Sequence, residues 1–219
     1  MTVSELLFEE LCTKCGFQFE KIVESSKKSP DYFLQIRNYK FVVEVKQIDL
    51  NKEEKQILNT DPALWGEYEA TYGEIPGQRI RSKIRTSMRQ MKAVNCSQLP
   101  FLLVIYNNTD FWDEYTSPES VRVAMYGIEA ILISSKPAPG GGATILSRWY
   151  GPEKSITISH NTSLSGIAIL KKTDDGISLD IYHNYFAKNK LPQFEENTIS
   201  HYCLEDAPDK GFPRWVAAK

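Results

Sequence analysis

Apolar residues recur at helical spacing at the start of the chain. Leu7, Leu11 and Cys15 follow one another at intervals of four residues, which is the period of one face of an α-helix. Ser4 can cap such a helix at its N-terminus, and Gly16 can end it. The pattern therefore predicts an amphipathic helix between these two residues.

The pattern then changes to short runs that alternate or are rich in β-branched and aromatic residues. Such runs occupy residues 17–23, 31–36 and 41–48. The polar residues Arg37–Lys40 separate the last two runs and suit a hairpin loop. We therefore expect three strands, of which the second and third form a hairpin.

A less regular segment follows, and then a second helix and a fourth strand. Residues 51–77 contain Pro62, Gly66, Gly73 and Pro76, which indicates an insertion with short helical pieces. An apolar stripe at Ile80, Ile84, Met88 and Met91 predicts an amphipathic helix over residues 78–94. The continuous apolar run at 101–106 is typical of a strand that is buried on both faces.

The second half of the chain is richer in strand patterns. Candidate strands fall within residues 127–134, 155–159, 166–170 and 177–182, and a glycine-rich loop occupies 136–144. The whole order predicts an α/β fold with a mixed central sheet flanked by helices. We expect one domain over residues 1–219, with a core at 1–107, an insertion at 51–77 and a strand-rich extension at 108–219.

The composition is that of an ordinary globular protein. The chain has 219 residues, of which 42% are hydrophobic and 25% are charged, and it has no apolar run of the roughly 18 residues that a membrane span needs. Residues 1–17 mix acids with apolar residues, so we expect a helix there and not a signal peptide. Four cysteines do not make a disulfide framework in a chain of this size. We expect a cytoplasmic protein with no membrane partner.

The charge distribution is uneven although the net charge is only −2. Residues 78–92 hold six basic and no acidic residues, namely Arg79, Arg81, Lys83, Arg85, Arg89 and Lys92. A helical wheel places Arg81, Arg85, Arg89 and Lys92 in one stripe, with Arg79 and Lys83 on the far side. The interpretation we favour is contact with nucleic acid, led by Arg81 and Arg85 with Lys83 and Arg89 beside them. The alternative is a solvated helix face.

Charged residues also interrupt the third predicted strand. Glu44 and Lys46 share one face of that strand with Val42, and burial of a charge is costly unless it is paired or binds a metal. Asp31 begins the neighbouring strand and lies toward the same end of the hairpin. Two carboxylates suit Mg²⁺, and the ammonium of Lys46 can orient an attacking water. The alternative is a surface hairpin edge that carries a Glu–Lys pair.

The sequence Pro30-Asp31, followed by Glu44-Val45-Lys46, resembles the PD-(D/E)xK signature of the restriction-endonuclease-like nuclease superfamily. The predicted order of helix, three strands, helix and strand is also similar to the core of that superfamily, and the resemblance covers about residues 4–107. It implies that Asp31 and Glu44 bind Mg²⁺, or Mn²⁺ in its place, together with the backbone carbonyl of Val45. It also implies that Lys46 serves the attacking water, and that the products carry 5′-phosphate and 3′-hydroxyl ends.

The resemblance points to one further carboxylate on the first helix. In Mrr-type members such a glutamate is followed by fixed apolar positions and a glycine. Counted from Glu5, these positions fall on Leu7, Phe8, Leu11, Cys12, Cys15, Gly16 and Phe17. The register fails from Glu9, so Glu5 is preferred over Glu9. The alternative is a solvated glutamate favoured by the helix dipole. Some relatives carry a glutamine on the helix after the Glu-x-Lys strand, which makes Gln90 a further candidate.

These patterns together favour a Mg²⁺-dependent endonuclease that hydrolyses phosphodiester bonds in DNA, of the restriction, defence or DNA-processing type. Two alternatives stay open. One is a nuclease that acts on RNA or single-stranded nucleic acid within a defence system. The other is a non-catalytic nucleic-acid-binding or assembly module on the same fold. We expect residues 108–219 to provide specificity, a homodimer surface or both.

Overall fold

The computed structural model describes residues 1–23, 29–59, 76–91, 98–109, 113–136 and 140–218. Its helices are α1 (Val3–Lys14), α2 (Lys52–Leu58), α3 (Gln78–Met91), the short 3₁₀ helix η2 (Asp113–Thr116) and α4 (Pro118–Tyr126). Its strands are β1 (Gln18–Lys21), β2 (Tyr32–Ile36), β3 (Tyr39–Ile48), β4 (Phe101–Asn107), β5 (Glu129–Ile133), β6 (Ile145–Tyr150), β7 (Leu164–Thr173), β8 (Gly176–His183), β9 (Ile199–Leu204) and β10 (Trp215–Ala217).

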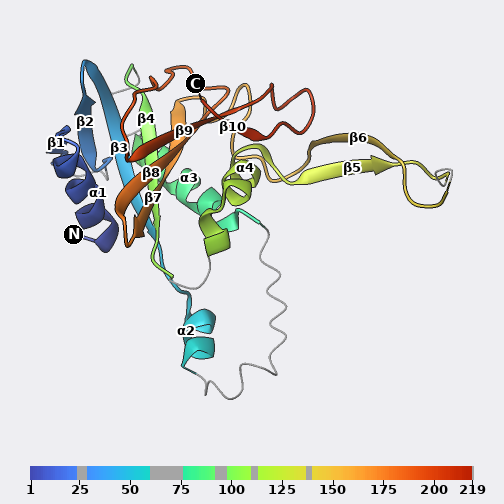
Figure 1. Cartoon of the computed structure of the whole chain (residues 1–219), viewed down its shortest axis with the longest axis horizontal. Coiled ribbons are helices and arrows are strands. Elements are labelled where there is room, and N and C mark those ends of the chain that lie inside the picture. The colour runs from blue at the N-terminus through green and yellow to red at the C-terminus, as the bar shows by residue number, and fades with distance from the viewer. Residues whose placement is uncertain (24–28, 60–75, 92–97, 110–112, 137–139, 219) are drawn as a thin grey trace.

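Eight strands form one mixed sheet in the order β1-β2-β3-β4-β7-β8-β9-β10. The pairs β3–β4, β4–β7 and β8–β9 are parallel, and the other neighbours are antiparallel. Figure 1 shows α1 on one side of this sheet and α3 with α4 on the other. The predicted α/β class, with a mixed central sheet flanked by helices, is confirmed.

Helix α1 covers one face of the sheet through the apolar positions that its period predicted. Leu7, Phe8 and Leu11 are buried in a core cluster with Val43 and Val45 of β3. The N-cap differs from the prediction, because the side chain of Thr2 accepts from the Glu5 N–H and forms a capping box with it. Ser4 is buried instead, and its N–H donates to Oε1 of Gln47 at 3.1 Å. These contacts fix the start of α1 against the end of β3.

The opposite face of the sheet is covered by α3 and α4. The predicted stripe of Ile80, Ile84, Met88 and Met91 is buried there in a second core cluster. Gly77, just before α3, has a φ of 74°, and a Cβ at this position would lie 2.7 Å from the Ser120 carbonyl oxygen. Glycine therefore allows α3 and α4 to approach closely.

Strand β4 is buried on both faces, as its continuous apolar run predicted. Leu102 and Val104 belong to the α1-side core, whereas Leu103 and Ile105 belong to the α3-side core. This burial follows from the position of β4 between two parallel neighbours in the middle of the sheet.

The second half of the chain differs most from the sequence prediction. Helix α4 was not foreseen, and residues 155–159 form no strand but a turn closed by a bridge between Thr157 and His160. Strands β7 to β10 extend the main sheet, whereas β5 and β6 pair with each other outside it. The residues predicted to form most of the insertion (60–75) and the end of the second helix (92–94) lie outside the described residues.

Strands β5 and β6 form a two-stranded arm that projects from the body of the molecule (Figure 1). The arm carries six large apolar side chains that are at least 42% exposed, namely Ile131, Leu132, Ile133, Ile145, Leu146 and Trp149. Within the described residues, no helix is long and apolar enough to cross a membrane.

Candidate active site

The β2–β3 hairpin brings Asp31 next to the backbone of Val45. The Asp31 N–H donates to the Val43 carbonyl oxygen at 3.1 Å, which continues the antiparallel ladder to the start of β2. In return, the Val45 N–H donates to Oδ2 of Asp31 at 2.7 Å. The aspartate is therefore fixed by main-chain hydrogen bonds in both directions, beside the residue that separates Glu44 from Lys46.

Glu44 and Lys46 project from β3 on the face that α3 covers, as the alternation of strand residues predicted. The Glu44 side chain has no exposed surface, and Oε1 forms an ion pair with Nζ of Lys46. Apart from this ion pair, neither carboxylate oxygen of Glu44 has a hydrogen-bond partner among the described residues. Lys46 keeps 24% of its side chain exposed. The pair thus joins a fully buried carboxylate to a half-buried ammonium at the solvent boundary.

Both carboxylates have a raised proton affinity. Burial and the neighbouring charge of Asp31 raise the pKa of Glu44 to about 7, although the ion pair with Lys46 acts in the opposite direction. Burial also raises the pKa of Asp31, while the Val45 N–H and the charge of Lys46 oppose that shift. A carboxyl group whose pKa is raised to about 7 beside a second carboxylate readily binds a counter-charge, whether proton or cation.

The structure gives Glu5 and Glu9 different surroundings. Glu5 lies close enough for its charge to raise the pKa of Asp31, but Oε2 of Glu5 also accepts from the Thr2 N–H at 2.8 Å as part of the capping box. Glu9 accepts a hydrogen bond of 2.7 Å from the hydroxyl of the buried Tyr32. Glu5 is therefore the helix carboxylate nearer to the candidate site, and Glu9 holds α1 to β2.

One flank of α3 faces the same end of the hairpin. Nε2 of Gln90 donates to the Ser29 carbonyl oxygen at 3.3 Å, two residues before Asp31. Burial lowers the pKa of Lys83, Asp49 opposes this shift, and Lys46 adds to it, so the two lysines lie within electrostatic reach of each other. Ser87 lies one turn after Lys83 and is also buried. The sequence patterns did not single out Ser87. The signal that could have found it is the spacing of residues 83, 87 and 90, which places them on one flank of the helix.

The arginines predicted to bind nucleic acid lie on the opposite flank of α3. Arg81 is only 8% exposed, and its guanidinium donates to Oε1 of Gln78 at 3.2 Å and lies 3.8 Å from a carboxylate oxygen of Glu153. The Arg81 guanidinium is therefore engaged within the protein. Arg85 and Arg89 are exposed. Of the four predicted cations, the structure brings Lys83 alone toward Asp31, Glu44 and Lys46.

The candidate site offers a pair of carboxylates. Across the described ranges, no group of three or more His, Cys, Asp or Glu residues is arranged to hold a metal ion. Mg²⁺ suits a pair nonetheless, because it keeps several waters and is usually bound through one or two carboxylates plus substrate phosphates. The buried carboxylate of Glu44, which has only the ion pair with Lys46 among the described residues, lies beside Asp31 and fits such an ion.

Comparisons with models of protein families, with curated proteins and with solved structures found no match to this chain. The function of the site therefore has to be inferred from its own residues.

Proposed function

We propose that this chain is a Mg²⁺-dependent nuclease of the PD-(D/E)xK type, with Asp31, Glu44 and Lys46 in its active site. The observation that carries this proposal is the complete burial of the Glu44 carboxylate beside Asp31 and Lys46. A fully buried carboxylate that has, among the described residues, only the ion pair with Lys46 and lies beside a second carboxylate is costly for a protein that uses it only for packing. Such sites are typical of catalytic centres.

The arrangement of elements around the pair supports the proposal. Helix α1, the strands β1, β2 and β3, helix α3 and strand β4 follow one another in the order that the resemblance implies. Strand β3 and strand β4 are parallel neighbours connected through α3. Asp31 lies directly before β2 and Glu44 lies on β3, which are the places that the resemblance implies for the active site.

Each side chain has a distinct role in the proposed reaction. Asp31, Glu44 and the main chain of Val45 would hold the cation, which supplies positive charge to the scissile phosphate and acidifies water. Lys46, at the solvent boundary, orients the attacking water and stabilises the negative charge that develops on the phosphate. Lys83 adds a second positive charge on the α3 side, where a phosphate of the substrate would approach.

Cleavage assays with active-site variants test the proposal. Purified protein with Mg²⁺ or Mn²⁺ should cut plasmid DNA, whereas Asp31→Asn, Glu44→Gln and Lys46→Gln should each lose at least about a hundredfold in rate. Asp180→Asn is a matched control, because Asp180 also forms an ion pair with a lysine, Lys171, on the same sheet. Equal cutting by all four variants would exclude this active site.

A substrate panel and a metal-binding assay separate the alternatives. Plasmid DNA, single-stranded DNA and RNA incubated side by side identify the substrate class, and we expect DNA. Mg²⁺ should raise the melting temperature of the parent protein but not of Asp31→Asn, because a ligand stabilises only the state that binds it. Tight DNA binding without cleavage under any divalent cation would instead favour a non-catalytic module.

A further inference from the structure

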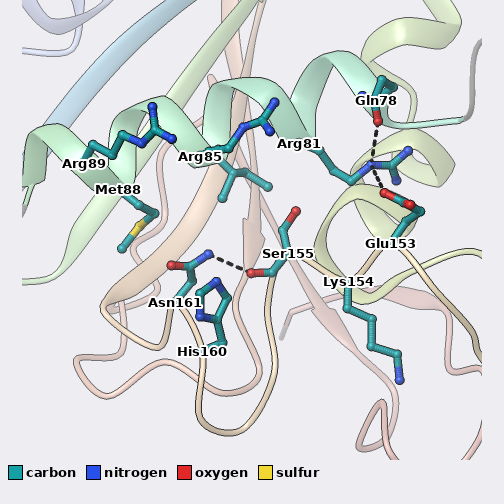
Figure 2. Close-up of a pocket in the computed structure, with 11 residues that line it drawn as sticks. Gln78, Arg81, Arg85, Met88, Arg89, Glu153, Lys154, Ser155, His160 and Asn161 are labelled. Carbon is teal, nitrogen blue, oxygen red and sulfur yellow. Dashed lines mark hydrogen bonds and ion pairs between the residues drawn. The ribbon is translucent and has the colours of Figure 1, made fainter.

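A second basic site lies across α3 from the carboxylate pair. A pocket of about 380 Å³ separates this helix from the loop between β6 and β7. Figure 2 shows Arg81, Arg85 and Arg89 along the helix on one side and Lys154, Ser155, His160 and Asn161 of the loop on the other. The residues of α3 that face the carboxylates, Lys83 and Gln90, do not line this pocket. The two sites are therefore separate.

The lining of the pocket has an excess of positive charge. It contains the four cations Arg81, Arg85, Arg89 and Lys154 and one carboxylate, that of Glu153. Glu153 lies 3.8 Å from Nε of Arg81, which is buried and also bound to Gln78. Among the described lining residues, the one negative charge is thus used to hold the loop against the helix. The charges of Arg85, Arg89 and Lys154 are not balanced by another carboxylate of this lining, so the pocket has a positive electrostatic potential.

Arg85 and Arg89 are available for a ligand. Both are exposed, and the described part of the chain offers neither of them a hydrogen bond or an ion pair. One helical turn separates them, so their attachment points lie about 6 Å apart along the helix axis. In Figure 2 their side chains extend along the helix. Because no bond holds them there, they can turn onto an anion without breaking an existing contact.

The opposite wall of the pocket is held in place by its own hydrogen bonds. Nδ2 of Asn161 donates to the Ser155 carbonyl oxygen at 2.8 Å, and the His160 N–H donates to Oγ1 of Thr157 at 3.1 Å. Asn161 has a φ of 53°, a conformation that asparagine tolerates better than most residues. The His160 ring and Lys154 are therefore carried by an ordered turn, which lowers the entropy cost of ligand binding.

We propose that this pocket binds a phosphate group of a nucleotide, either free or within a nucleic-acid strand. Paired arginines match phosphate oxygens with their planar, multiple N–H donors. The volume falls in the range of small-ligand sites. Among the described residues that line the pocket there is no Phe, Tyr or Trp, so none of them would stack on the base and the phosphate carries the recognition. The inference does not depend on the proposed nuclease activity.

Binding measurements in EDTA test this site without cation or turnover. Calorimetric titrations would use pyrophosphate, AMP and a short single-stranded oligonucleotide as probes. Arg85→Gln and Arg89→Gln should each weaken binding about tenfold, and the double variant should weaken it further. Arg148→Gln, which removes one exposed positive charge on the β5–β6 arm, should leave the affinity unchanged. Amide NMR shifts at His160 and Asn161 should report the ligand in the parent protein.

The three probes distinguish a free nucleotide from a nucleic-acid strand as the source of the phosphate. Arginine-dependent binding of pyrophosphate and AMP identifies a free nucleotide ligand, and arginine-dependent binding of the oligonucleotide alone identifies a strand phosphate. The proposal is overturned if no probe binds, or if the double variant keeps the parent affinity to within about twofold. An equal loss in Arg148→Gln would also overturn it, because the effect would then be that of net charge.

Discussion

The carboxylate of Glu44 and the ammonium of Lys46 form an ion pair on the face of β3 that α3 covers. The glutamate has no exposed surface, whereas the lysine reaches solvent. Because the two residues are two positions apart on one strand, they share a face whatever the rest of the fold does. Because α3 buries that face, the pKa of Glu44 is raised to about 7. The Glu-x-Lys sequence alone would not have this effect.

Because the pKa of Glu44 is raised, replacing this carboxyl with a neutral side chain should increase the stability of the fold by an amount that depends on pH. A carboxyl with a folded pKa of about 7, against an ordinary value of 4.5, stabilises the fold fully below pH 4.5, and this contribution is lost as the pH rises through 7. Glu44→Gln should therefore raise the free energy of unfolding by about 2 kcal/mol at pH 8, or about 4–8 °C in Tm. At pH 4.5 and below it should give no gain. Thermal unfolding at both values checks this, and a gain of equal size at both would contradict it.

The same ionisation predicts the pH dependence of metal binding. A cation bound between Asp31 and Glu44 has to displace the proton that Glu44 holds below pH 7. The affinity for Mg²⁺ should therefore rise about tenfold per pH unit below pH 7 and level off above it. Calorimetry in two buffers with different ionisation enthalpies would also measure the released proton. A flat affinity between pH 6 and pH 8 would show that Glu44 is not a ligand.

Lys83, on the flank of α3 that faces the carboxylates, should contribute to DNA binding. Lys83 lies near Lys46, whereas Arg85 faces the pocket on the other flank. In a Lys46→Gln background, which prevents cleavage, Lys83→Met should weaken DNA binding about tenfold and reduce the salt slope by about 1. Lys14→Met, on the far face of the sheet, serves as the control and should change neither quantity. Fluorescence anisotropy over a range of salt concentrations measures both.

Glu9 should prove to be a structural residue. Its hydrogen bond from the buried Tyr32 hydroxyl is 2.7 Å long, so Tyr32→Phe should lower the free energy of unfolding by about 1–2 kcal/mol. Glu9→Gln should leave the rise in Tm with added Mg²⁺ unchanged, because that carboxylate is already engaged. If Glu9→Gln abolished the rise, Glu9 and not Glu5 would be the helix carboxylate of the site.

A buried histidine pair should limit stability in acid. Nε2 of His183 lies 2.8 Å from Nδ1 of His201, and burial, with the charges of His201 and Lys190, lowers the pKa of His183 to about 4. A lowered histidine pKa gives stability that is present above pH 6.5 and is lost as the pH falls through 4. The difference in free energy of unfolding between parent and His183→Gln should therefore shrink by about 3 kcal/mol between pH 7 and pH 4. A constant difference across this range would contradict the lowered pKa.

The elements with a strong local signal were predictable. The period of Leu7 and Leu11 identified α1, and the stripe from Ile80 to Met91 identified α3, because each helix buries one continuous apolar face. Helix α4 was missed, since its buried residues lie nearly all round the helix and leave no polar face to read. The turn at 155–160 resembled a strand, but its alternation has no partner strand and is closed by a local bridge.

The candidate site was predictable in its composition but not in its surroundings. The positions of Asp31, Glu44 and Lys46 follow from strand alternation and the hairpin, which are local properties. Glu5 was preferred over Glu9 from the register of the apolar positions, whereas the hydrogen bond from Tyr32 to Glu9 is a contact between α1 and β2 that the sequence does not reveal. The helical wheel placed Lys83 away from Arg81, Arg85 and Arg89, yet it could not say which flank of α3 faces the carboxylates.

By itself, the sequence determined that one strand carries Glu44 and Lys46 on the same face and that an aspartate precedes the neighbouring strand. Only the tertiary structure decided that this face is buried, that Glu44 holds its proton near neutral pH, and that Arg81 is tied to Glu153. The physical reason is that side-chain alternation is set within a strand, whereas desolvation and charge pairing depend on segments distant in sequence. The packing of α3 on β3 and of the 153–161 loop on α3 supplies those environments.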